Sequence, residues 1–140
     1  MREPLNIPDT DANRDTWVYW FAEHLTRTWP TAIVRASVEG YKAPGVRRGV
    51  LPDVEFWYPN EAGVHQLLHL YQLVPTPFLN ERDVQGDLRD LLAYCRTNGR
   101  QLTLVVPDRA LTREELEELD AALGATLSPM LFEVAAYTVE

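Results

Sequence analysis

The segment LPDVEFWYP, residues 51–59, places two acidic side chains where they could bind a metal ion. Asp53 follows a proline, and Glu55 comes two residues later, so both carboxylates would point to the same face of a β-strand. Carboxylate oxygens are the ligands that Mg²⁺ prefers, and Mg²⁺ held in this way can activate water for hydrolysis of a phosphodiester. The segment therefore predicts half of a metal-dependent site, with Asp53 and Glu55 as the candidate metal ligands.

The elements that would position these residues follow from the spacing of apolar residues. Helical spacing predicts helices over 16–28, from Val84 to near Gly99, and from Thr112 to Gly124. The last of these has the clearest start, because Thr112 and Glu115 form the pattern of a capping box. Alternating or continuous apolar runs predict strands over 31–40, 50–58, 64–74, 101–106 and 130–140. We expect the order α-β-β-β-α-β-α-β in a single domain over residues 16–140, preceded by a polar extension over residues 1–15.

The order and spacing of these segments resemble a known family over residues 50–123. The stretches LPDVEFWYPN, HLYQLV, DLRDLLAYCRTNG and RQLTLVVPDRALT follow one another as in the PD-(D/E)xK nuclease domains of bacterial polymorphic toxin systems. In that family a Pro-Asp-Val strand leads to a Glu-x-Lys strand, a helix, a glycine, an apolar strand and a last helix. The resemblance implies an α/β fold of the restriction-endonuclease-like class, with a mixed sheet flanked by helices.

The resemblance also implies where the rest of the active site should lie. It aligns His69 with the glutamate of the family and Tyr71 with its lysine. Histidine is a poor ligand for the hard Mg²⁺ ion, and a tyrosine with a pKa near 10 does not supply the positive charge of lysine. We therefore interpret the catalytic positions Asp53, His69 and Tyr71 as vestigial.

Other residues offer alternatives for a metal site. Glu23 or Glu39 could join Asp53 and Glu55 around Mg²⁺, with His69 acting as the base. The three histidines match no recognised spacing for zinc ligands. Cys95, the single cysteine, excludes both a disulfide and a thiolate metal cluster within one chain.

Trp57, Arg47 and Arg48 are the candidate binding residues. Trp57 would share the strand face of Asp53 and Glu55, where it could contact a protein surface or pack against the first helix. Arg47 and Arg48 lie in a glycine-flanked loop, where they could contact a phosphate or remain solvated.

Composition limits the classes of partner. The chain carries 13 basic and 21 acidic residues, so its net charge of −8 repels nucleic acid and favours a basic protein. No apolar run is long enough to cross a bilayer, and the first 15 residues do not resemble a signal peptide. We expect a cytoplasmic protein with no membrane contact and no cofactor, unless an active site binds Mg²⁺.

Three functional hypotheses follow. The first is a catalytically inactive nuclease-fold protein that binds another protein, as an immunity or neutralising protein that binds a basic toxin; homodimerisation would also fit. The second is a Mg²⁺-dependent DNA or RNA nuclease with a rearranged site. The third is a nucleic-acid-binding module, which requires Lys42, Arg47, Arg48, Arg82 and Arg89 to share one face.

Overall fold

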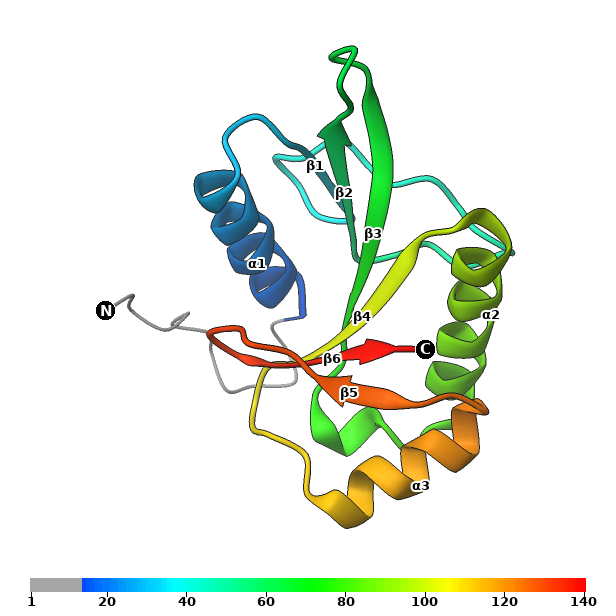
Figure 1. Cartoon of the computed structure of the whole chain (residues 1–140). Coiled ribbons are helices and arrows are strands. Elements are labelled where there is room, and N and C mark those ends of the chain that lie inside the picture. Colours follow the sequence, from blue (N-terminus) through cyan, green and yellow to red (C-terminus); the bar gives the residue numbers. More distant parts are fainter. Residues whose placement is uncertain (1–13) are drawn as a thin grey trace.

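The computed structural model describes residues 14–140, which form a mixed α/β structure (Figure 1). The elements in chain order are α1 (Arg14–Thr28), β1 (Ile33–Ala36), β2 (Val54–Pro59), β3 (His65–Leu73), the short 3₁₀ helix η2 (Thr76–Phe78), α2 (Arg82–Asn98), β4 (Gln101–Val106), α3 (Arg113–Leu123), β5 (Leu127–Pro129) and β6 (Ala135–Val139). The α/β class expected from the sequence is confirmed. Residues 1–13, most of the expected polar extension, lie outside the described residues, and residues 14 and 15 belong to α1.

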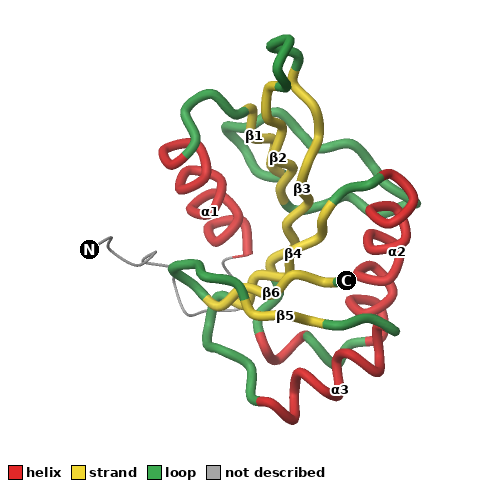
Figure 2. The backbone as a smooth tube through the Cα atoms, viewed as in Figure 1, coloured by secondary structure: helices red, strands yellow, loops and turns green. Residues whose placement is uncertain are grey.

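Six strands form one twisted sheet in the order β1-β2-β3-β4-β6-β5. Neighbouring strands are antiparallel except for β3 and β4, which are parallel and are connected through α2. A parallel pair needs such a crossover, because a short turn reverses the direction of the chain. Helix α1 covers one face of the sheet, and α2 and α3 cover the other (Figures 1 and 2).

Each face of the sheet has its own apolar core. On the α1 face, Trp17, Phe21 and Leu25 pack against Tyr71 and Leu73 of β3. The larger core on the opposite face is built from side chains of α2, α3 and the central strands. Strand β4 contributes to both cores, because residues 102–106 are all buried, as expected for a strand covered on both sides.

The ends of the helices agree with the local sequence signals. Helix α2 ends at Gly99 and α3 at Gly124, both of which adopt the left-handed conformation that glycine tolerates, with φ of 66° and 62°. Thr112 and Glu115 form the reciprocal hydrogen bonds of the expected capping box. Local chemistry alone therefore fixes these helix ends.

Strands β1, β2, β3 and β6 are shorter than expected, β4 has the expected bounds, and β5 was not expected. Residues 50–53 do not belong to β2, because Arg47 and Val50 exchange backbone hydrogen bonds in a tight loop. The expected strand over 130–140 is limited to β6, which pairs with the unexpected strand β5. Three residues that include Ser128 and Pro129 are too few to show an alternating pattern.

Between residues 14 and 140, no helix is both long enough and apolar enough to span a membrane.

Candidate functional site

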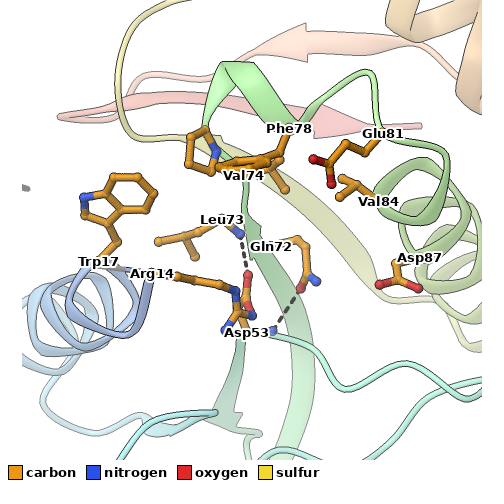
Figure 3. A pocket seen from close by; sticks show the side chains of 11 residues that line it. Arg14, Trp17, Asp53, Gln72, Leu73, Val74, Phe78, Glu81, Val84 and Asp87 are labelled. Atoms are coloured by element: carbon orange, nitrogen blue, oxygen red, sulfur yellow. Dashed lines mark hydrogen bonds and ion pairs between the residues drawn. The ribbon is translucent and has the colours of Figure 1, made fainter. Parts of the chain in front are cut away.

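Asp53 lies immediately before β2, on the floor of a cavity between α1 and α2 (Figure 3). Its side chain is 1% exposed. One carboxylate oxygen, Oδ2, accepts a hydrogen bond of 2.8 Å from the backbone N–H of Leu73, and the other, Oδ1, forms an ion pair with the guanidinium of Arg14. The backbone N–H of Asp53 donates to Oε1 of Gln72 at 2.9 Å. Both oxygens of the expected metal ligand therefore already have protein partners.

The residues of β3 nearest Asp53 are not those that the sequence alignment indicated. Val54 pairs with Tyr71, and the contacts of Asp53 are with Gln72 and Leu73. The side chains of Gln72 and Val74 line the cavity, whereas neither His69 nor Tyr71 does. Because side chains alternate along a strand, a shift of one residue in register exchanges one face for the other.

His69 and Tyr71 instead lie on the α1 side of β3. Their rings stack with centroids 4.4 Å apart and an interplanar angle of 9°, and the Tyr71 ring contacts Phe21 at 4.9 Å. Nε2 of His69 forms a hydrogen bond with Oγ1 of Thr103. Burial lowers the pKa of His69 to about 4 and raises the pKa of Tyr71 to about 12. Both side chains are therefore uncharged at neutral pH, as packed parts of the interior.

Glu55 is completely buried in a network of its own. Its Oε2 accepts hydrogen bonds from Nε and Nη2 of Arg47, at 3.1 and 2.9 Å, and from the N–H of Gly45 at 3.2 Å. Its Oε1 accepts from the indole N–H of Trp57 at 3.1 Å. The prediction that Glu55 would join Asp53 at one metal is not supported by this arrangement, because four donors already surround the Glu55 carboxylate.

The candidate binding residues Trp57, Arg47 and Arg48 do not form one surface either. Trp57 packs against the core that faces α2 and α3, not against the first helix, and the guanidinium of Arg35 lies 4.8 Å from its ring. Arg47 pairs with Glu55 and lies 5.1 Å from the ring of Tyr94. Arg48 is exposed and has a φ of 50°. Arg47 is thus a counter-ion of the interior, and only Arg48 is placed as a surface charge.

The residues present do not fit the Mg²⁺ site that the family resemblance implies. No group of three or more histidine, cysteine or acidic residues within the described part of the chain could hold a metal ion. The immediate neighbours of Asp53 are an amide, an aliphatic side chain and a cation, where a metal would need further oxygen ligands. The carboxylates of Glu81 and Asp87 line the same cavity but do not gather with Asp53 into a group that could hold a metal ion. Glu23 accepts a hydrogen bond from the hydroxyl of Tyr41, and Glu39 is exposed outside the strands.

The histidines are also apart from one another. His24 lies 3.4 Å from the carboxylate of Glu133, and Nε2 of His65 contacts the backbone oxygen of Thr31. A zinc site made of His24, His65 and His69 is therefore not formed.

The cavity around Asp53 combines buried polar groups with apolar walls. It has a volume of about 270 Å³. Its lining comes from three parts of the chain besides Asp53. These are α1 (Arg14 and Trp17), the end of β3 with the segment that follows it (Gln72, Leu73, Val74, Pro75 and Phe78), and the region where α2 begins (Glu81, Val84 and Asp87). The sequence pattern indicated Asp53 but gave no sign of Gln72, Arg14 or the two acidic residues at the rim of the cavity, Glu81 and Asp87. Nothing local in the sequence brings these segments together.

No family model matches this chain, and no curated protein is significantly similar to it. The functional argument therefore depends on the geometry of the described residues.

Proposed function

We propose that this chain is a catalytically inactive protein of nuclease-like architecture that acts by binding another protein. The observation that carries the proposal is the ion pair between Arg14 and Asp53. A metal-dependent nuclease needs a carboxylate that is free to bind a cation, and here an arginine of the same chain provides that cation. The negative charge of Asp53 at the floor of the cavity is therefore neutralised by the positive charge of Arg14, without an added cation.

The environment of Asp53 supports the same conclusion. In the family that the sequence resembles, a second carboxylate and a lysine complete the site. In this chain Gln72 and Val74 line the cavity beside Asp53, and neither can carry a charge. Glu55, the acidic residue of β2, is held by Arg47 and has no part in the cavity.

The order of elements is compatible with the restriction-endonuclease-like architecture on which this proposal builds. From β2 to α3 the chain runs strand, strand, helix, strand and helix, as the resemblance implies. An inactive domain of this type retains a shaped cavity at the ends of its central strands, which is a common position for a binding site in α/β proteins.

The charge of the chain indicates the class of partner. A net charge of −8 favours a basic protein over nucleic acid, and an immunity or neutralising protein directed at a basic toxin is the specific form that we propose. The proposal places the protein in the cytoplasm, where the buried thiol of Cys95 would stay reduced.

The test is calorimetric titration of Mg²⁺ and Mn²⁺ into the protein, together with plasmid and RNA cleavage assays. Wild type, Asp53→Ala and Arg14→Gln are compared. We expect neither metal binding nor cleavage in the wild type. Metal binding that appears only in Arg14→Gln would show that the arginine occupies the position of a metal. Cleavage by the wild type that is lost in Asp53→Ala would overturn the proposal.

A further inference from the structure

The cavity around Asp53 has a strongly asymmetric charge. Four charged side chains line it: Arg14, Asp53, Glu81 and Asp87. Arg14 and Asp53 neutralise each other at the floor, so the two remaining carboxylates leave the cavity with a net formal charge of −2. In Figure 3, Glu81 and Asp87 lie on the α2 side, across from Trp17 on α1. The rim therefore has a negative side for which residues 14–140 supply no counter-ion.

The start of α2 adds further negative charge. Asp83, Asp87 and Asp90 follow one another at helical spacing after the N-cap residue Glu81, and none of the four forms an ion pair with a described residue. The pKa of Asp87 is raised by desolvation and by the neighbouring charges of Asp90 and Asp83. A cation bound at this position would relieve that repulsion.

Gln72 supplies a second, independent sign of a ligand at the floor of the cavity. Its side chain is 8% exposed, and its Oε1 accepts from the backbone N–H of Asp53. A backbone N–H can only donate, so this contact fixes the orientation of the amide and directs Nε2 away from Asp53. Nε2 forms no hydrogen bond with any residue in the described range, and Gln72 lines the cavity. An N–H group of this largely buried side chain thus remains available to an acceptor that enters the cavity.

The walls between these polar groups are apolar. Phe78 and Val84 are partly buried, and with Val74 they give the cavity an apolar wall. A matching ligand has an oxygen acceptor, an aliphatic section and a positive charge. An arginine or lysine residue in a peptide chain has all three, because its backbone carbonyl, methylene stem and charged head follow in that order.

We propose that this cavity binds a basic side chain, arginine or lysine, that a partner protein presents on a loop. The carbonyl oxygen of the loop accepts from Nε2 of Gln72, the methylene stem lies against Phe78 and Val84, and the cation meets Glu81 and Asp87. This inference deepens the proposed protein-binding function, on which it rests, by giving the chemistry of the contact.

The experiment uses a pair of small probes whose backbone ends are both blocked, so that only the side chain differs in charge. The full chain, labelled with ¹⁵N and ¹³C, is titrated with Nα-acetyl-arginine N-methylamide and, separately, with the citrulline analogue, which is nearly isosteric but uncharged. The reporters are the side-chain amide signals of Gln72 and the methyl signals of Val84. We expect saturable shifts of both reporters with the arginine probe, and binding in the millimolar range because one residue buries little surface.

Two matched variants test the position of the charge. Glu81→Gln with Asp87→Asn neutralises the rim, whereas Asp83→Asn with Asp90→Asn makes the same change in net charge on the same helix but outside the cavity. Because an exposed charge pair shifts an equilibrium by up to about fivefold, we expect the rim variant to weaken arginine binding about threefold or more and the control to weaken it less.

Equal binding of the citrulline probe, equal weakening by the two variants, or reporters that do not move would each overturn the inference. Shifts of the reporters with protein concentration alone would assign the cavity to a second copy of the chain and would overturn it also. These outcomes are independent of the metal and cleavage assays. If the arginine probe does not bind and the wild type shows neither metal binding nor cleavage, only the basic-side-chain contact is refuted. Cleavage by the wild type that is lost in Asp53→Ala would refute the proposed function itself.

Discussion

Replacing Arg47 by methionine should destabilise the protein strongly, because it leaves the buried carboxylate of Glu55 without its cation. Glu55 accepts four hydrogen bonds, and two of them come from Arg47. A hydrogen bond to a charged group contributes about 1.5–3 kcal/mol, and breaking a buried ion pair by removing one partner costs about 3–5 kcal/mol. Since the Arg47 side chain is 22% exposed, we expect about 3 kcal/mol, at the lower end of this range.

This loss translates into a measurable change in the melting temperature. The entropy of unfolding is about 2.1 cal/mol/K per residue, or roughly 0.3 kcal/mol/K for a chain of this size. A loss of about 3 kcal/mol should therefore lower the Tm by about 10 °C in a calorimetric or circular dichroism scan.

Arg48→Met is the matched control, because it removes the same charge from the adjacent, exposed position in the loop. We expect this control to change the stability by less than about 0.5 kcal/mol. The double variant Arg47→Met with Glu55→Met should recover most of the lost stability, since no buried charge remains. If Arg47→Met lowers the Tm no more than Arg48→Met does, the role of Arg47 as the counter-ion of Glu55 is wrong.

Three further predictions concern single side chains. Burial holds the pKa of His69 at about 4, below its ordinary value of 6.5. Between these two pH values the imidazole binds a proton in the unfolded chain but not in the folded one. The free energy of unfolding therefore falls progressively as the pH drops from 6.5 to 4, by up to about 3 kcal/mol. His69→Gln should flatten this part of the profile of urea midpoints, and an unchanged slope would refute the assignment. Thr112→Ala should cost about 1 kcal/mol in thermal unfolding, because the N–H of Glu115 loses its acceptor; a Tm equal to that of the wild type would contradict this. Burial raises the pKa of the Cys95 thiol to about 11, so iodoacetamide at pH 8 should label this cysteine only in urea, and rapid labelling of the folded protein would show that the thiol is accessible.

Elements with a strong local signal could be predicted from the sequence. The capping box of α3 and the glycines after α2 and α3 need only neighbouring residues, and the structure confirms them. The continuous apolar run of β4 also indicated a strand buried on both faces. Strand β5 could not be found in this way, because it is defined by its pairing with β6 and not by its own composition.

The site depended on information that no single segment contains. Register between β2 and β3 shifts at Phe56 and Trp57, so counting along β3 does not show that Gln72 lies beside Asp53. The partners that neutralise the carboxylates, Arg14 and Arg47, come from a helix and a loop outside the short segment that carries Asp53 and Glu55. Pairs of this kind are set by the tertiary arrangement, for which a local pattern gives no signal.

Strand β4 lies between β3 and β6, and β6 is the only strand that covers its second edge. An apolar strand with an open edge readily pairs with strands of other molecules. In the order of synthesis β4 leaves the ribosome before β6, and all of α3 is made in between. Between these two strands the nascent chain therefore exposes an unpaired apolar edge. Substitutions that weaken β6 should reduce the yield of soluble protein more than their effect on the finished fold suggests.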